Sequence, residues 1–145
     1  MESFPIGKAG ARMMLVKNPA GCNQVIDFLS AIDEDFELVV CLNDKTGDGT
    51  DLSWIWDTNF EAFAEMGDRL KGVTVSGIRH ADMALRMKYA GVSEDKIHSQ
   101  PDYEALCDAI AQAEHPVYLI PTYSAMLELR GHIVKRTGGA EFWEG

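Results

Sequence analysis

Short, uninterrupted apolar runs recur along the chain, separated by polar or glycine-containing segments. Residues 38–42 read Leu-Val-Val-Cys-Leu, and further apolar runs occur at 12–16, 72–76 and 116–120. A shorter strand is expected around 96–98. Unbroken apolar runs of this length are typical of strands that are covered on both faces. We therefore predict that 38–42 forms a central strand of a sheet that contains the other runs.

Helical periodicity fills the intervals between these runs. Apolar residues recur at helical spacing in five segments, at 24–32, 60–66, 82–90, 103–113 and 124–136. Asn59 and Asp102 stand where side chains commonly cap a helix N-terminus, and Gly91 stands where glycine commonly ends one. Strands and helices therefore alternate along the whole chain, which is the pattern of a parallel sheet with helices on both faces.

We predict one α/β domain spanning residues 1–145, a Rossmann-like three-layer fold whose mainly parallel sheet has roughly five or six strands. Ligands of such sheets bind beyond the carboxyl ends of the strands. The loops expected there begin at 17–18, 43–44, 77–79 and 121–122. These four loops should converge in space although they are far apart in the sequence.

Composition narrows the range of partners. The formal net charge is −10 and the pI is about 4.7, so the surface repels nucleic-acid phosphates and anionic membranes. No apolar run approaches the roughly 18 residues that cross a bilayer, and the N-terminus lacks a signal-peptide layout. Three scattered cysteines, Cys22, Cys41 and Cys107, fit small core residues of a cytoplasmic protein better than a disulfide framework.

The most unusual segment is 44–57, which follows the predicted central strand and is rich in aspartate, glycine and tryptophan. Its Asp-x-Gly-x-Asp spacing is reminiscent of a calcium loop, but no glutamate follows at the last ligand position. Each aspartate therefore has two readings: a turn residue that caps local amides, or a carboxylate that orients a histidine or binds a cation. Trp54 and Trp56, taken as neighbours on one side of a strand, and Trp143 are candidate interface anchors.

No complete catalytic set is evident elsewhere. There is no Gly-x-Ser-x-Gly elbow, and Gly7-Lys8 lacks the rest of a phosphate loop. His98 and His115 are expected in structural or surface roles. The start of the last helix, at Thr122 and Ser124, fits either a side-chain cap or an anion site. If the chain takes part in catalysis, it contributes only part of a site.

Four blocks of sequence resemble the C-terminal domain of the MurT family. They are Val16–Val25, Asp48–Asp57, the segment from Ser76 to Arg86, and Pro121–Arg130. The second block, Asp-Gly-Thr-Asp-Leu-Ser-Trp-Ile-Trp-Asp, is long and unusual in composition. The blocks occur in order across nearly the whole chain. The resemblance implies a fold like that of Mur ligase C-terminal domains.

The resemblance also implies a function. MurT pairs with a GatD-type glutaminase to amidate the D-glutamate of the lipid II stem peptide, using ATP and glutamine. ATP and Mg are expected in a Mur-ligase middle domain, which this chain lacks together with its phosphate loop and zinc ribbon. The C-terminal domain is expected to lend an aspartate to the glutaminase: Asp51, with Asp48 as the second choice. The alternative is a stand-alone binding or protein-interaction module without catalysis.

Overall fold

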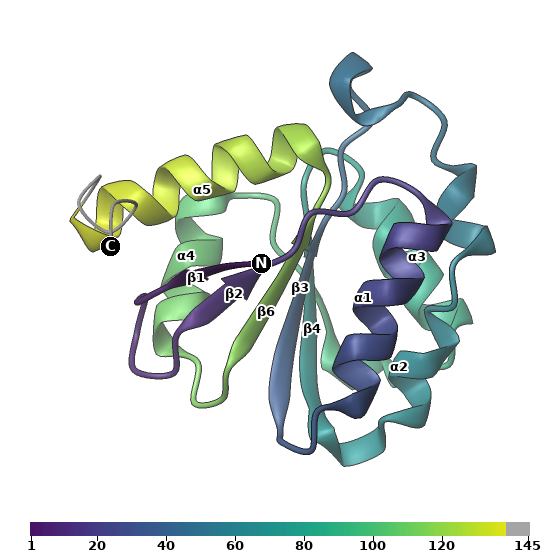
Figure 1. Cartoon of the computed structure of the whole chain (residues 1–145), viewed down its shortest axis with the longest axis horizontal. Helices are drawn as coiled ribbons and strands as arrows, with labels where there is room; N and C mark the ends of the chain where they lie inside the picture. The colour runs from purple at the N-terminus through teal and green to yellow at the C-terminus, as the bar shows by residue number, and fades with distance from the viewer. Residues whose placement is uncertain (139–145) are drawn as a thin grey trace.

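The sheet of this protein has six strands in the order β1-β2-β6-β3-β4-β5 (Figure 1). We describe it from a computed structural model, which covers residues 1–138. The strands are β1 (Glu2–Phe4), β2 (Ala11–Met13), β3 (Phe36–Cys41), β4 (Leu70–Ser76), β5 (Ile97–Ser99) and β6 (Val117–Pro121). All neighbouring strands run parallel except β1, which pairs with β2 in the antiparallel sense.

β3 lies between β6 and β4, as its uninterrupted apolar run predicts. Leu38, Val39 and Val40 are all nearly inaccessible to solvent, so alternate side chains enter the core on opposite faces of the sheet. The prediction of a central strand in a mainly parallel sheet is therefore confirmed. The short strand expected around 96–98 is also present, as β5 at the sheet edge.

Five helices cover the two faces. They are α1 (Pro19–Ala31), α2 (Glu61–Glu65), α3 (His80–Tyr89), α4 (Tyr103–Gln112) and α5 (Tyr123–Thr137). The first three pack over one face of the sheet and share one hydrophobic core, whereas α4 and α5 cover the other face with a second core (Figure 1). The predicted three-layer architecture is thus observed.

Four short 3-10 helices complete the described chain. They are η1 (Thr46–Asp48), η2 (Ser53–Asp57), η3 (Gly67–Arg69) and η4 (Glu94–Lys96). The tryptophan segment forms η2, so the prediction that Trp54 and Trp56 lie on a strand is wrong. Ile55 is buried at 1% exposure and turns this segment inward, whereas Trp56 is 49% exposed. Trp143 lies outside the described residues.

Capping explains where several helices begin and end. The Asn18 side chain accepts a hydrogen bond from the Gly21 amide at 2.9 Å, so α1 begins at Pro19 rather than at residue 24. Asp102 caps α4 by accepting from the Glu104 amide, as predicted. No side-chain cap by Asn59 forms at α2. Gly91, at φ 96°, follows the end of α3, as predicted.

Candidate functional site at the carboxyl ends of the strands

Asn43 joins three of the four loops that were expected to converge. It follows β3 directly, and only 1% of its surface is exposed. Its backbone amide donates to Thr122 Oγ1 at 3.0 Å, and its side-chain nitrogen donates to Ser124 Oγ at 2.9 Å. Its side-chain oxygen accepts from the Ile78 amide at 2.7 Å. One buried amide therefore fixes the loops that follow β3, β4 and β6 relative to one another.

Gly77 permits this close approach. Its φ of 88° lies in the left-handed region, where side chains are rarely tolerated. A Cβ atom there would lie 2.5 Å from the Leu42 carbonyl oxygen and 2.8 Å from Asn43 Oδ1. Glycine is thus required by both the backbone conformation and the lack of space.

Asp48 is tied into the fold by both of its carboxylate oxygens. One oxygen accepts from the Ser124 amide at 2.6 Å, and the other accepts from the Ser124 hydroxyl and from the Lys45 amide. Asp48 thereby caps the N-terminus of α5 from a distant loop, a role that the sequence assigned to Thr122 or Ser124. The Thr122 hydroxyl instead accepts a hydrogen bond from the Asn43 backbone amide, and it makes no cap at the start of α5.

Asp51 is placed differently. It is exposed, and its carboxylate accepts a hydrogen bond within its own turn from the Ser53 amide at 2.9 Å. This hydrogen bond from the Ser53 backbone holds the pKa of Asp51 below its usual value of 3.8. The side chain is therefore ionised at neutral pH and acts only as an acceptor. Its position is fixed by the turn while much of its hydrogen-bonding capacity faces solvent.

An aromatic and basic cluster lies next to this turn. The rings of Trp56 and Tyr89 have centroids 5.9 Å apart, and both residues are exposed. The Arg86 guanidinium lies over Trp56 at 5.1 Å and over Phe60 at 5.4 Å. Exposed tryptophan and tyrosine side chains are enriched in surfaces that bind another protein.

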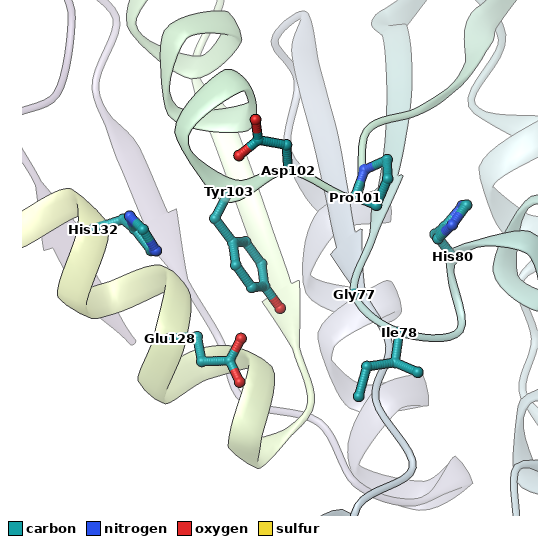
Figure 2. A pocket seen from close by; sticks show the side chains of 8 residues that line it. All are labelled: Gly77, Ile78, His80, Pro101, Asp102, Tyr103, Glu128 and His132. Atoms are coloured by element: carbon teal, nitrogen blue, oxygen red, sulfur yellow. The ribbon is translucent and has the colours of Figure 1, made fainter.

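A pocket of about 460 Å³ opens at the same end of the sheet, between α5 and the N-termini of α3 and α4 (Figure 2). Its lining residues are Gly77, Ile78, His80, Pro101, Asp102, Tyr103, Glu128 and His132. The Tyr103 ring points between Glu128 and Gly77 in Figure 2, and burial raises the pKa of its hydroxyl. Neither Asp48 nor Asp51 lines this pocket, so the carboxyl edge carries two separate features.

The polar side chains of the pocket are mostly engaged with neighbours. Glu128 forms an ion pair with Lys45 at 2.9 Å, and His132 Nδ1 is hydrogen-bonded to the Glu104 carboxylate. His80 Nδ1 lies 3.3 Å from Ser99 Oγ. No local pattern singles out His80 or His132, because the residues that they contact come from distant segments.

The three cysteines are not activated as nucleophiles. Burial raises the pKa of Cys22 and Cys41 to about 12 and that of Cys107 to about 11, so none supplies a thiolate at neutral pH. Within residues 1–138 no three metal-ligating side chains gather into a group, and no helix is long and apolar enough to cross a membrane. The described part of the chain therefore presents the ionised carboxylate of Asp51 but no thiolate and no group of metal ligands.

The Gly7-Lys8 pair does not form a phosphate loop. Gly7-Lys8 lies in the turn between β1 and β2, at the amino ends of the parallel strands, whereas the candidate site lies at their carboxyl ends. A Cβ atom at Gly7 would lie 2.4 Å from the Ala111 carbonyl oxygen, so this glycine is packed against α4 rather than open to a phosphate.

The fold places the chain in the class of Mur-ligase-type C-terminal domains. Folylpolyglutamate synthase from Thermotoga maritima superposes with a TM-score of 0.61 at 15% identity, over 99% of this chain and 32% of that one. UDP-N-acetylmuramate-alanine ligase MurC from the same organism superposes with a TM-score of 0.56 at 12% identity, over 91% and 27%. At such identities the likeness concerns the fold alone.

Sequence comparison identifies the family. The model of the MurT ligase C-terminal family matches residues 15–126, and the chain belongs to that family. Subunit MurT of the glutamine-hydrolysing lipid II isoglutaminyl synthase of Streptococcus pneumoniae is 34% identical over 136 residues, 93% of this chain and 30% of that protein. The Staphylococcus aureus subunit (strain COL) is 30% identical over 126 residues, 87% and 28%. The chain thus spans under a third of the length of these relatives.

Proposed function

We propose that this chain acts as the C-terminal domain of a MurT-type subunit and completes the active site of a GatD-type glutaminase. The complex would amidate the D-glutamate of the lipid II stem peptide in the cytoplasm, with ATP and Mg held by a separate middle domain. Family membership and the names of the relatives support this assignment. The unpaired, buried cysteines are in keeping with a reducing compartment.

The observation that carries the catalytic part is the placement of Asp51. Its carboxylate is ionised, faces solvent and is fixed by a hydrogen bond from its own turn. In a glutaminase, a cysteine attacks the amide carbon of glutamine and a histidine accepts the thiol proton. A carboxylate that accepts the hydrogen bond of the histidine Nδ1–H fixes the ring tautomer and stabilises the imidazolium. Asp51 would supply that acceptor across the subunit interface.

Asp48, the second choice, is less suited to this role. Its oxygens already accept hydrogen bonds from Ser124 and Lys45, so a histidine would have to displace contacts that hold α5. Asp51 can accept the histidine without giving up a contact that holds the fold, whereas recruiting Asp48 would remove the cap of α5.

Amide hydrogen exchange of the assembled complex tests the docking proposal. A subunit that carries this domain is compared with and without a GatD-type glutaminase, and glutamate release is followed in parallel. We expect protection of residues 49–57 and of Tyr89 on complex formation. Protection confined to the β1–β2 edge would overturn the proposal. So would a glutaminase that is fully active without the subunit.

A further inference from the structure

Arg86 is the one charged residue among residues 1–138 that is classed as buried, with 2% of its surface exposed. A buried charge is retained at a cost unless hydrogen bonds and an opposite charge compensate for it. Arg86 lies on α3, away from the strand-end loops that hold the rest of the candidate site. The reason for its burial must therefore be found in what it contacts.

Its contacts converge on the tryptophan segment. Nε donates to the Ile55 carbonyl oxygen, and one terminal nitrogen donates to the Thr58 carbonyl oxygen, each at 2.8 Å. The same terminal nitrogen forms an ion pair with Glu61 at 2.8 Å. The face of the guanidinium lies over Trp56. Arg86 thus binds the middle and the end of η2 and links them to α2 and α3.

Two further hydrogen bonds connect this clamp to Asp51. The Ile55 amide donates to the Leu52 carbonyl oxygen at 3.1 Å, and the Ser53 amide donates to the Asp51 carboxylate at 2.9 Å. The carbonyl of Ile55 is held by Arg86, so the restraint passes along a short stretch of backbone to the carboxylate. On the other side of the turn, Asp48 is fixed to α5. Asp51 is therefore held between two anchored points.

We propose that Arg86 is a positioning residue that holds η2 so that Asp51 points at the partner histidine. The inference rests on the proposed function, because it concerns the same carboxylate. Arginine is needed because its planar fork reaches two carbonyl oxygens and a carboxylate at once while its face stacks on an aromatic ring. A lysine ammonium at this position keeps the charge but cannot satisfy the same set of acceptors.

The chain offers a matched control. Arg69 also donates to two backbone carbonyl oxygens, those of Ile32 and Ser30 near the end of α1. It immediately precedes β4, so it lies at the amino end of the sheet, opposite the candidate site. Arg69→Lys therefore makes the same chemical change and loosens a comparable contact without touching η2.

The test uses the complete glutaminase complex carrying Arg86→Lys, Arg69→Lys or Asp51→Asn. We expect Arg86→Lys to lower kcat for glutamine hydrolysis, towards the roughly hundredfold loss that a displacement of about 1 Å can cause. KM for glutamine should stay unchanged, because glutamine is bound by the other subunit. In the same variant the amides of Ser53 and Ile55 should exchange faster. Arg69→Lys should leave both kcat and the exchange rates of these amides unchanged, although it should lower Tm by a similar amount.

The outcomes separate the two proposals. If Asp51→Asn abolishes turnover but Arg86→Lys behaves like Arg69→Lys, the positioning role is wrong and the proposed function stands. If Asp51→Asn leaves turnover unchanged, the catalytic role proposed for Asp51 fails and the positioning role of Arg86 fails with it. Arg86→Gln removes the buried charge together with the fork, so it replaces Arg86→Lys if an unpaired ammonium prevents folding.

Discussion

Replacing Asn43 with alanine should destabilise the whole strand-end region. The substitution removes the acceptor of the Ile78 amide and the donor to the Ser124 hydroxyl. A buried amide left without a partner costs about 1–3 kcal/mol, and loss of the second hydrogen bond adds about 1 kcal/mol. We therefore expect the free energy of unfolding to fall by about 2–4 kcal/mol in total.

Urea denaturation followed by circular dichroism measures this loss. With a slope of about 2 kcal/mol per molar urea, the midpoint should fall by about 1–2 M. Asn18→Ala is the matched control, because Asn18 makes a single hydrogen bond at the start of α1 and its loss should cost about 1 kcal/mol. If Asn43→Ala costs no more than Asn18→Ala, Asn43 does not hold the three loops together.

A near-isosteric variant separates the hydrogen bonds from the loss of volume. Asn43→Asp keeps the acceptor for the Ile78 amide, but an ionised carboxylate cannot donate to the Ser124 hydroxyl. It would also lie near the Asp48 carboxylate, because the same hydroxyl is hydrogen-bonded to Asp48. Burial near a second carboxylate raises the pKa of the new side chain above its unfolded value. The variant should therefore lose stability relative to the native chain as the pH rises through that pKa. A difference that does not vary with pH would contradict this reasoning.

Three further predictions concern stability. Gly77→Ala should lower the free energy of unfolding by about 2–4 kcal/mol through backbone strain and overlap. Gly49→Ala, whose Cβ would meet no atom within 4 Å, should lower it by only about 1–2 kcal/mol. Equal losses in thermal unfolding would contradict the close approach at Gly77. Asp48→Ala should cost about 1–2 kcal/mol by uncapping α5, and faster amide exchange in its first turn should accompany the loss. The hydrogen bond from Arg86 lowers the pKa of Glu61 below its usual 4.5, so the pair stabilises the fold above the pKa of the unfolded state, and this stability is lost as the pH falls through the pKa of the folded state. Glu61→Gln should flatten the pH dependence of stability in that range. An unchanged profile would argue against the pair.

Much of the fold follows from local patterns. The run at 38–42 predicted a central strand because only a strand covered on both faces has no polar positions. β1 was missed because three residues are too few to show a period, and its antiparallel pairing depends on a neighbour. The predicted helix begins at residue 24, too late, because a loop was expected from 17–18; Asn18 and Pro19 instead form the cap and first position of α1, a common helix start. The tryptophan segment was misread because Ile55 and its neighbours alternate as a strand would.

The candidate site was only partly predictable. Convergence of the loops follows from the direction of parallel strands, and it was predicted. The contacts that distinguish the two aspartates did not follow, because Asp48 meets Ser124 across 76 positions of sequence. Arg86 gave no signal of its own, since its carbonyl partner Ile55 is 31 positions away and an arginine on a helix is usually exposed. Long-range hydrogen bonds to backbone groups leave no pattern in a single sequence.

The glutaminase rate of a complex carrying Asp51→Asn tests the central claim most directly. The replacement is nearly isosteric and lies on an exposed turn, so the fold of the domain should be unchanged; the rate is therefore measured with the subunit at concentrations that keep the complex assembled. Loss of the triad aspartate of a serine protease lowers kcat about ten-thousandfold, and we expect a fall of several orders of magnitude here. Asp33→Asn is the control, because Asp33 is an exposed aspartate in the loop before β3, at the amino ends of the parallel strands. If the Asp51→Asn complex turns over glutamine as fast as the Asp33→Asn complex, the central claim is contradicted and Asp51 is only a turn residue. Loss of activity in Asp48→Asn alone, with α5 intact, would assign the role to Asp48 instead.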